Sequence, residues 1–215
     1  MSLNNNIQNL QNIISSLEGK AAGGGSSVQD NAQYAQIIRF TDAVFPEGYE
    51  MQLKLLNSLS MPVFRGTTGI RKVTIDVPTE KTYDASNMAY MANTIEEFVF
   101  PNGIKFPVAN YMCTNAASLR SIQGTMDMTG NTSNNMWTGC TLLEHISFVP
   151  NTIGAKVDFA KSPLLSDASI QSIIDGLANL SGQTTQTLTL HADVGAKLTE
   201  AQKESARLKN WTLAY

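Results

Sequence analysis

A motif that recurs at constant spacing limits the folds open to this chain more than any other feature of its sequence. Its strongest copies place an aliphatic residue at Ile95, Leu119 and Leu143, so that the step between successive copies is the same. A fainter copy at residues 70–75 precedes Ile95 by nearly the same step. One unit of this length cannot bury its apolar side chains alone, so such units stack on their neighbours and share a continuous core.

The spacing within each copy predicts the local structure. The third copy reads Leu143-Glu144-His145-Ile146-Ser147-Phe148, in which the apolar residues follow the pattern L-x-x-I-x-I. In repeats of about 20–29 residues this pattern is typical of a leucine-rich-repeat solenoid with one short parallel strand per repeat. We therefore predict an α/β fold built on such a solenoid, a type of fold that serves binding more often than catalysis.

The flanking sequence predicts a covering unit at each end of the repeats. Two strands around a turn at 45–48 are expected to cover the first strand of the solenoid, because an open edge would be prone to aggregation. After the repeats, Ser166 and Thr199 are expected to cap two helices, with strands at 187–190 and 211–213. The predicted segments are an anchoring or coiled-coil helix at 1–20, a Gly/Ser linker at 21–29, a β N-terminal cap at 30–60, the repeats at 61–160 with a degenerate last unit at 156–159, and an α/β C-terminal cap at 161–215.

The segment 1–20 has the spacing of an amphipathic helix with a heptad seam. Isoleucine at a and leucine at d favours a two-stranded coil, although so short a seam specifies the number of strands weakly. A helix of this length is marginal alone in water, so it either folds back on its own domain or, as we favour, anchors the chain and makes it a homo-oligomer. The seam residues are Leu3, Ile7, Leu10, Ile14 and Leu17.

Charged residues between the apolar anchors are expected to form a ladder across adjacent strands. Stacking the copies aligns Arg71, Glu96, Arg120 and Glu144, and one position further Lys72, Glu97, Ser121 and His145. Opposite charges on neighbouring strands stabilise a sheet by about 0.2–1 kcal/mol a pair. The ladder is interpreted first as a device that fixes the strand register; a binding surface for a sugar or a partner protein is the compatible alternative.

Composition and motifs exclude several classes of function. Charged residues make up 15% of the chain and the net charge is -3, so neither nucleic acid nor an anionic membrane is an expected partner. No apolar run is long enough to span a membrane, and Met1 is not followed by the pattern of a secretory signal, so the chain is expected to remain in the cytoplasm unless it leaves within a particle.

Residues that could support catalysis or hold a cofactor are few. Cys113 and Cys140 lack the spacing of a metal site and are expected to be buried thiols. His145 and its neighbour Glu144 are expected to diverge, and His191 is expected to serve a turn or a cap. The aromatic residues at Phe64, Tyr111 and Trp137 are expected to pack in the core. We therefore predict no catalytic residue, no metal, no cofactor and no enzymatic activity.

The spacing Met136-Trp137-x-x-Cys140-x-x-Leu143-x-x-Ile146-x-Phe148 resembles the BspA-type leucine-rich repeat. The other copies depart from it, since Ala89 replaces the aromatic residue and Ala92 and Ala116 occupy the cysteine position. The C-terminal stretch from 162 to 191, with 197–199 and 210–212, is similar to the end of leucine-rich-repeat proteins in phages and prophages of Gram-positive gut bacteria. The resemblance covers about residues 60–215 and implies a virion structural protein of tail, baseplate or head-fibre type.

Three functions follow from these patterns. The first is a phage virion protein, assembled in the bacterial cytoplasm, whose N-terminal helix binds other virion proteins and whose repeats contact a host-surface glycan or protein, or a neighbouring subunit. By resemblance to viral fibres such a protein would be a trimer, whereas the seam favours a dimer. The second is a bacterial surface adhesin of the same repeat type. The third is a glycan hydrolase in which the ladder would be the active face.

Overall fold

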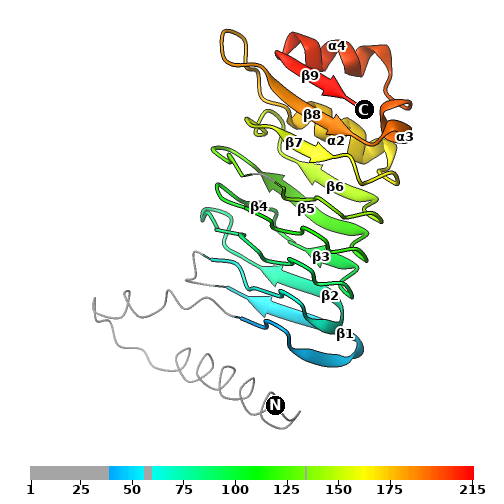
Figure 1. The fold of residues 1–215 in the computed structure, drawn as a ribbon. Coiled ribbons are helices and arrows are strands. Elements are labelled where there is room, and N and C mark those ends of the chain that lie inside the picture. Colours follow the sequence, from blue (N-terminus) through cyan, green and yellow to red (C-terminus); the bar gives the residue numbers. More distant parts are fainter. Residues whose placement is uncertain (1–38, 56–59, 134) are drawn as a thin grey trace, which may run out of the picture. The chain divides into compact units, whose positions relative to one another are not determined.

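The computed structural model describes residues 39–55, 60–133 and 135–215 (Figure 1). Contacts divide the chain into two units, Met1–Gln36 and Ile37–Tyr215, and the described residues all belong to the second. The predicted helix at 1–20 and linker at 21–29 therefore lie outside the described residues. The elements are β1 (Val44–Lys54), β2 (Thr68–Asp76), β3 (Glu97–Val99), β4 (Ile104–Lys105), β5 (Ser121–Asp127), β6 (His145–Phe148), β7 (Val157–Phe159), α2 (Asp167–Gly176), β8 (Gln186–Leu190), α3 (Ala192–Gly195), α4 (Glu200–Leu208) and β9 (Trp211–Ala214).

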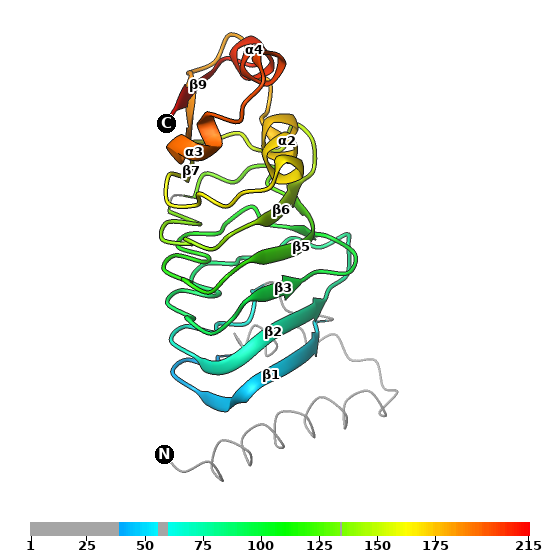
Figure 2. The ribbon, with the colours of Figure 1, turned by 90° about the vertical axis from the view of Figure 1, so that its right-hand side faces the viewer.

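In the larger sheet, β2, β3, β5 and β6 recur at about the spacing of the sequence motif. Its order is β1-β2-β3-β5, and both β4 and β6 also pair with β5. All of these pairs are parallel. Val73 lies opposite Phe98 and Phe98 opposite Ile122, so each residue faces its counterpart in the next copy of the motif. Figure 2 shows β1, β2, β3, β5 and β6 one after another on one side of the unit. The prediction of an α/β fold with parallel strands is confirmed.

Successive copies of the motif also contact each other on a second side. We use the word coil for each stretch of the chain from one strand of the larger sheet to the next. Amides of one coil donate to carbonyls of the next, for example Ala89 N–H to Met112 (2.6 Å) and Cys113 N–H to Met136 (2.8 Å). From Phe64 to Thr138 the coils are therefore bonded to their neighbours on two sides, and these bonds satisfy backbone groups that border the apolar interior.

The interior is filled by the aliphatic anchors and by aromatic rings. Ile95, Leu119 and Leu143 are completely buried, as the repeat predicted. The ring of Phe64 stacks on Phe40 at 5.2 Å between centroids and lies 6.0 Å from Phe98. Large buried side chains of this kind supply most of the free energy that stabilises a fold. The core thus runs from coil to coil without a break in this part of the unit.

Helix α2 takes the place of the strand that would follow β6. Ser166 caps it, as predicted, by accepting a hydrogen bond from Ser169 N–H (3.2 Å). The hydroxyl of Ser169 accepts from Ile146 N–H (3.0 Å) and donates to the carbonyl of Glu144 (2.9 Å), while the hydroxyl of Ser172 accepts from Phe148 N–H (2.8 Å). The serines therefore satisfy the edge of β6, which would otherwise be open to another strand.

The C-terminal part forms a second, three-stranded parallel sheet in the order β7-β8-β9. The predicted strands at 187–190 and 211–213 are β8 and β9. Thr199 caps α4, as predicted, with a capping box completed by Gln202. His191, predicted to serve a turn or a cap, is the N-cap of α3. The unit at 156–159, expected to be the last repeat, is β7 and pairs with β8, so it belongs to this second sheet and not to the larger one.

Two expectations about the repeats and their N-terminal neighbour are wrong. Residues 45–48 do not form a turn between two strands: they lie inside β1, at a bulge where the register with β2 shifts, and β1 pairs with β2 in parallel. Tyr111 does not pack in the core, since 46% of it is exposed. Its backbone has a left-handed φ of 55°, and at this turn its side chain lies outside the interior.

Candidate functional site

The charge ladder has the backbone register that its spacing predicts. Lys72 lies opposite Glu97, Glu97 opposite Ser121, and Ser121 opposite His145. The preceding column is joined by backbone hydrogen bonds of 2.8 Å, in which Glu96 N–H donates to Arg71, Arg120 N–H to Glu96 and Glu144 N–H to Arg120. Both columns therefore run from β2 to β6 in the predicted register, and the pairing of β5 with β6 shifts only after Ser121.

The ladder contains two of the ion pairs expected from this register. Lys72 Nζ lies 2.7 Å from Glu97 Oε2, with 29% and 17% of the two side chains exposed. Arg120 Nη1 lies 2.9 Å from Glu144 Oε1, with 48% and 35% exposed. The first pair contributes more to stability because water screens it less, and pairs as exposed as the second are worth only a few tenths of a kcal/mol.

The remaining contacts of the first column differ from the expected alternation. Arg71 pairs with Glu50 of β1 and not with Glu96. Glu96 forms no ion pair with a residue in the described ranges, although an arginine lies on each side of it in the column. The reason is that β1 lies beside β2 in parallel and offers Arg71 a second carboxylate on its other side. The sequence pattern predicted a hairpin at 45–48, so it did not place Glu50 beside β2 and did not predict Glu50 as the partner of Arg71.

The second column is joined to further polar residues that sequence reasoning missed. Glu97 also accepts a hydrogen bond from Gln123, which lies two positions along β5 from Ser121. His145 Nε2 lies 3.9 Å from Glu144 Oε2, so the expected divergence of these side chains is wrong. Glu144 precedes β6, whose first residue is His145, and the alternation of a strand does not apply across that boundary.

These contacts define what the ladder can do chemically. Arg71, Arg120 and His145 are exposed, and Lys72 and the three carboxylates are half-buried. Cations and anions alternate over one open face, which suits binding to a polar surface of mixed charge. Glu97 and Glu144 are each held by a cation, an arrangement that helps to fix the register.

The two cysteines are buried free thiols, as predicted. Cys140 donates a hydrogen bond from Sγ to the carbonyl of Cys113 (2.9 Å). Burial raises the pKa of Cys140 to about 12 and raises the pKa of Cys113 as well, with Cys140 as a second cause for the latter. Both groups are protonated at neutral pH, and a protonated buried thiol is a poor nucleophile and a poor metal ligand.

One group of candidate residues lies outside the described structure, and two types of site that the sequence does not predict are not found among the described residues. The seam residues Leu3, Ile7, Leu10, Ile14 and Leu17 lie outside the described residues. Within residues 39–55, 60–133 and 135–215, no group of three potential ligands is placed to hold a metal ion. In the same ranges no helix is long and apolar enough to cross a membrane.

No protein-family model matches the chain, and no curated protein or solved structure matches it.

Proposed function

We propose that the chain is a leucine-rich-repeat solenoid protein of the BspA type that serves as a structural component of bacteriophage virions. Its repeats would project from the tail, the baseplate or a head fibre and bind a host surface or a neighbouring subunit through the charge ladder. It would act without catalysis and without a cofactor. The observation that supports the solenoid is the parallel pairing of successive motif copies, with their anchors at Ile95 and Leu119 buried.

The support for a binding role comes from the open polar face of the larger sheet. A ladder that only fixed register could consist of closed ion pairs, but within the described ranges Glu96 is left without one, and Arg71 and Arg120 remain about half exposed. Groups that retain their hydration and their charge can bind a complementary partner without first breaking an internal pair. The virion assignment rests on the resemblance of the C-terminal segment and on the predicted anchoring helix.

The experiment that tests this function is immunogold labelling of phage particles from an induced lysate of the bacterium that encodes the chain. The antibody is raised against residues 61–215, and particles from a strain lacking the gene are the control. Gold on the tail tip, baseplate or capsid fits the proposal and separates host recognition from capsid decoration. Unlabelled particles with antigen on the cell surface would replace the proposal with the alternative, a bacterial surface adhesin.

The predicted oligomer is tested separately by light scattering on the full chain. We expect a dimer or a trimer, and expect the double variant Ile7→Ser/Ile14→Ser to be a monomer with an unchanged melting temperature of the repeats, because the seam would lose its apolar contacts. A wild-type chain that is monomeric at all concentrations would contradict the anchoring role of the helix.

A further inference from the structure

A polar cleft lies where the second row of hydrogen bonds between coils is interrupted. Up to the coil at 135–138, amides of one coil donate to carbonyls of the next, as Cys113 does to Met136 and Asn115 to Thr138, both at 2.8 Å. The next strand, β7, pairs with β8 instead. A cavity of about 330 Å³ is left between β7 and residues 135–137.

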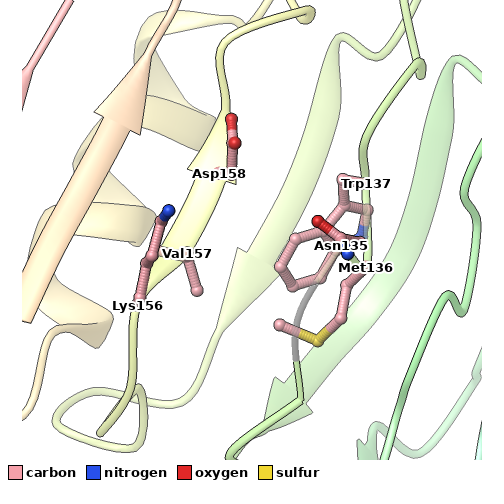
Figure 3. A pocket seen from close by; sticks show the side chains of 6 residues that line it. All are labelled: Asn135, Met136, Trp137, Lys156, Val157 and Asp158. Atoms are coloured by element: carbon pink, nitrogen blue, oxygen red, sulfur yellow. The ribbon is translucent and has the colours of Figure 1, made fainter.

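The two sides of the cleft contribute different groups (Figure 3). Asn135, Met136 and Trp137 lie on one side, and Lys156, Val157 and Asp158 on the other. Alternation along β7 buries Val157 and Phe159 and turns its charged neighbours outward. The ring of Trp137 is stacked on Phe159 at 4.9 Å between centroids. The cleft therefore has an apolar base held in place by stacking and a mouth lined by an amide, an ammonium and a carboxylate.

Much of the hydrogen-bonding capacity of these groups is unused among the described residues. Neither Lys156 nor Asp158 forms an ion pair with a residue in the described part. The two residues lie on the same side of the β7 segment, because both alternate with its buried positions. Asp158 Oδ1 accepts a hydrogen bond from Ala160 N–H (2.8 Å), and Oδ2 has no hydrogen-bond donor among the described residues. The indole Nε1 of Trp137 is buried and has no acceptor among the described residues. Buried donors without acceptors are uncommon, and a bound ligand or water is one explanation for them.

The coil before the cleft presents an exposed aromatic residue at a costly position. Asn87, Tyr111 and Asn135 occupy the same turn in successive coils, and all have a left-handed φ, between 55° and 58°. Asparagine tolerates this conformation, whereas for other residues it costs about 1–2 kcal/mol. Tyr111 nevertheless occupies it, 46% exposed, with its ring 6.3 Å from that of Tyr90. Strained positions cluster at functional sites, and tyrosine is enriched among the residues that contribute most to binding, so Tyr111 is a candidate contact.

We propose that this cleft binds one ring of a neutral saccharide, with Tyr111 beside it as a surface for an adjoining ring. The volume lies at the lower end of the ~300–1,000 Å³ of small-molecule sites, which suits a single ring. A sugar hydroxyl both donates and accepts, so it can bond to Lys156, to Asp158 and to the Asn135 amide together. An anion would meet Asp158 and a metal ion would find a single carboxylate, so both fit the cleft less well.

This inference goes beyond the proposed function, which places binding on the charge ladder, and does not depend on a location in a virion. The test is saturation-transfer NMR on the purified full chain with the methyl glycosides of glucose, galactose, mannose, N-acetylglucosamine and N-acetylgalactosamine, and with free glycine as a zwitterionic comparison. Asp158→Asn removes the charge and can retain the contact to Ala160. Asn135→Gly removes the amide and keeps a residue that accepts the left-handed backbone.

Two further variants make the test specific. Asp84→Asn is the matched control, because Asp84 also accepts from the amide two positions on (2.8 Å to Ser86) and lies outside the cleft. Tyr111→Asn introduces the residue found at the same turn in both neighbouring coils, so the fold is expected to survive. Melting curves on all four variants verify folding.

We expect at least one glycoside to receive saturation, with its Kd raised about tenfold in Asp158→Asn, which weakens a hydrogen bond to a charged group, and in Asn135→Gly, which removes a hydrogen bond to a neutral amide. Asp84→Asn should leave Kd unchanged, and Tyr111→Asn should weaken a disaccharide of the responding sugar more than its monosaccharide. The proposal is overturned if no glycoside responds, if the response persists in both cleft variants, or if glycine competes equally well.

Discussion

Replacing Ser169 with alanine tests whether the hydroxyls of α2 close the edge of the larger sheet. Ser169 is 3% exposed, and its hydroxyl bonds to two backbone groups of the β6 region, Ile146 N–H and the carbonyl of Glu144. The carbonyl also accepts from Ser166 N–H at 3.0 Å and so keeps one partner. The buried amide of Ile146 loses its acceptor in the variant and cannot reach water.

The expected magnitude follows from that single unsatisfied amide. Leaving a buried donor unpaired costs about 1–3 kcal/mol, and alanine returns up to ~0.5 kcal/mol through its higher helix propensity. The free energy of unfolding should therefore fall by about 1.5 kcal/mol. For a unit of this size each kcal/mol changes the melting temperature by roughly 2–4 °C, so the variant should melt about 3–6 °C lower.

The assay combines urea unfolding with amide hydrogen exchange, and Ser205→Ala is the matched control. Ser205 is also inside a helix, α4, but its hydroxyl bonds to no residue in the described part of the chain, so its replacement should be neutral or slightly stabilising. The amide of Ile146 should exchange faster in Ser169→Ala and unchanged in Ser205→Ala. If both variants had the same stability and the same exchange at Ile146, the edge-closing role of the serine would be refuted.

Three further predictions concern other parts of the described structure. Gly124→Ala should lower the free energy of unfolding by more than ~2 kcal/mol in urea unfolding, because its φ is 95° and a Cβ would lie 2.2 Å from the Phe100 carbonyl oxygen. Gly130 has φ 78° and no atom within 4 Å of a Cβ, so Gly130→Ala should lower the free energy of unfolding by about half as much in the same series. Glu96→Lys should lower the melting temperature at low salt, because it places a third cation in the ladder column. The effect on the free energy of unfolding should be about 1 kcal/mol or less, and added salt should reduce it. An unchanged melting temperature would contradict the register-fixing role of the ladder. Because burial raises the pKa of Cys140 to about 12 from 9.0, the folded state holds this proton over a range in which the unfolded state releases it. The contribution of Cys140 to stability should therefore be constant below pH 9 and be lost between pH 9 and 12, and the native thiols should resist Ellman's reagent until the protein unfolds.

The sequence by itself determined the features that depend on periodicity and on local backbone chemistry. A constant repeat length with alternating apolar side chains places Lys72 opposite Glu97 and Ser121 opposite His145, since one slip would turn every anchor away from the core. The caps at Ser166 and Thr199 also follow from local sequence, because a hydroxyl needs only amides two or three positions ahead. Burial of Cys113 and Cys140 belongs with these, since both lie close to the anchors.

Tertiary structure alone decided which groups meet between segments that the repeat does not relate. Arg71 pairs with Glu50 because β1 runs parallel to β2, and no local signal at 45–48 distinguishes a bulge within a strand from a turn. The cleft beside Asn135 exists because β7 pairs with β8 and leaves the preceding row of hydrogen bonds. Each outcome depends on competition among distant partners for one edge or one charge, and the free energies that decide such competitions arise only once the chain has packed.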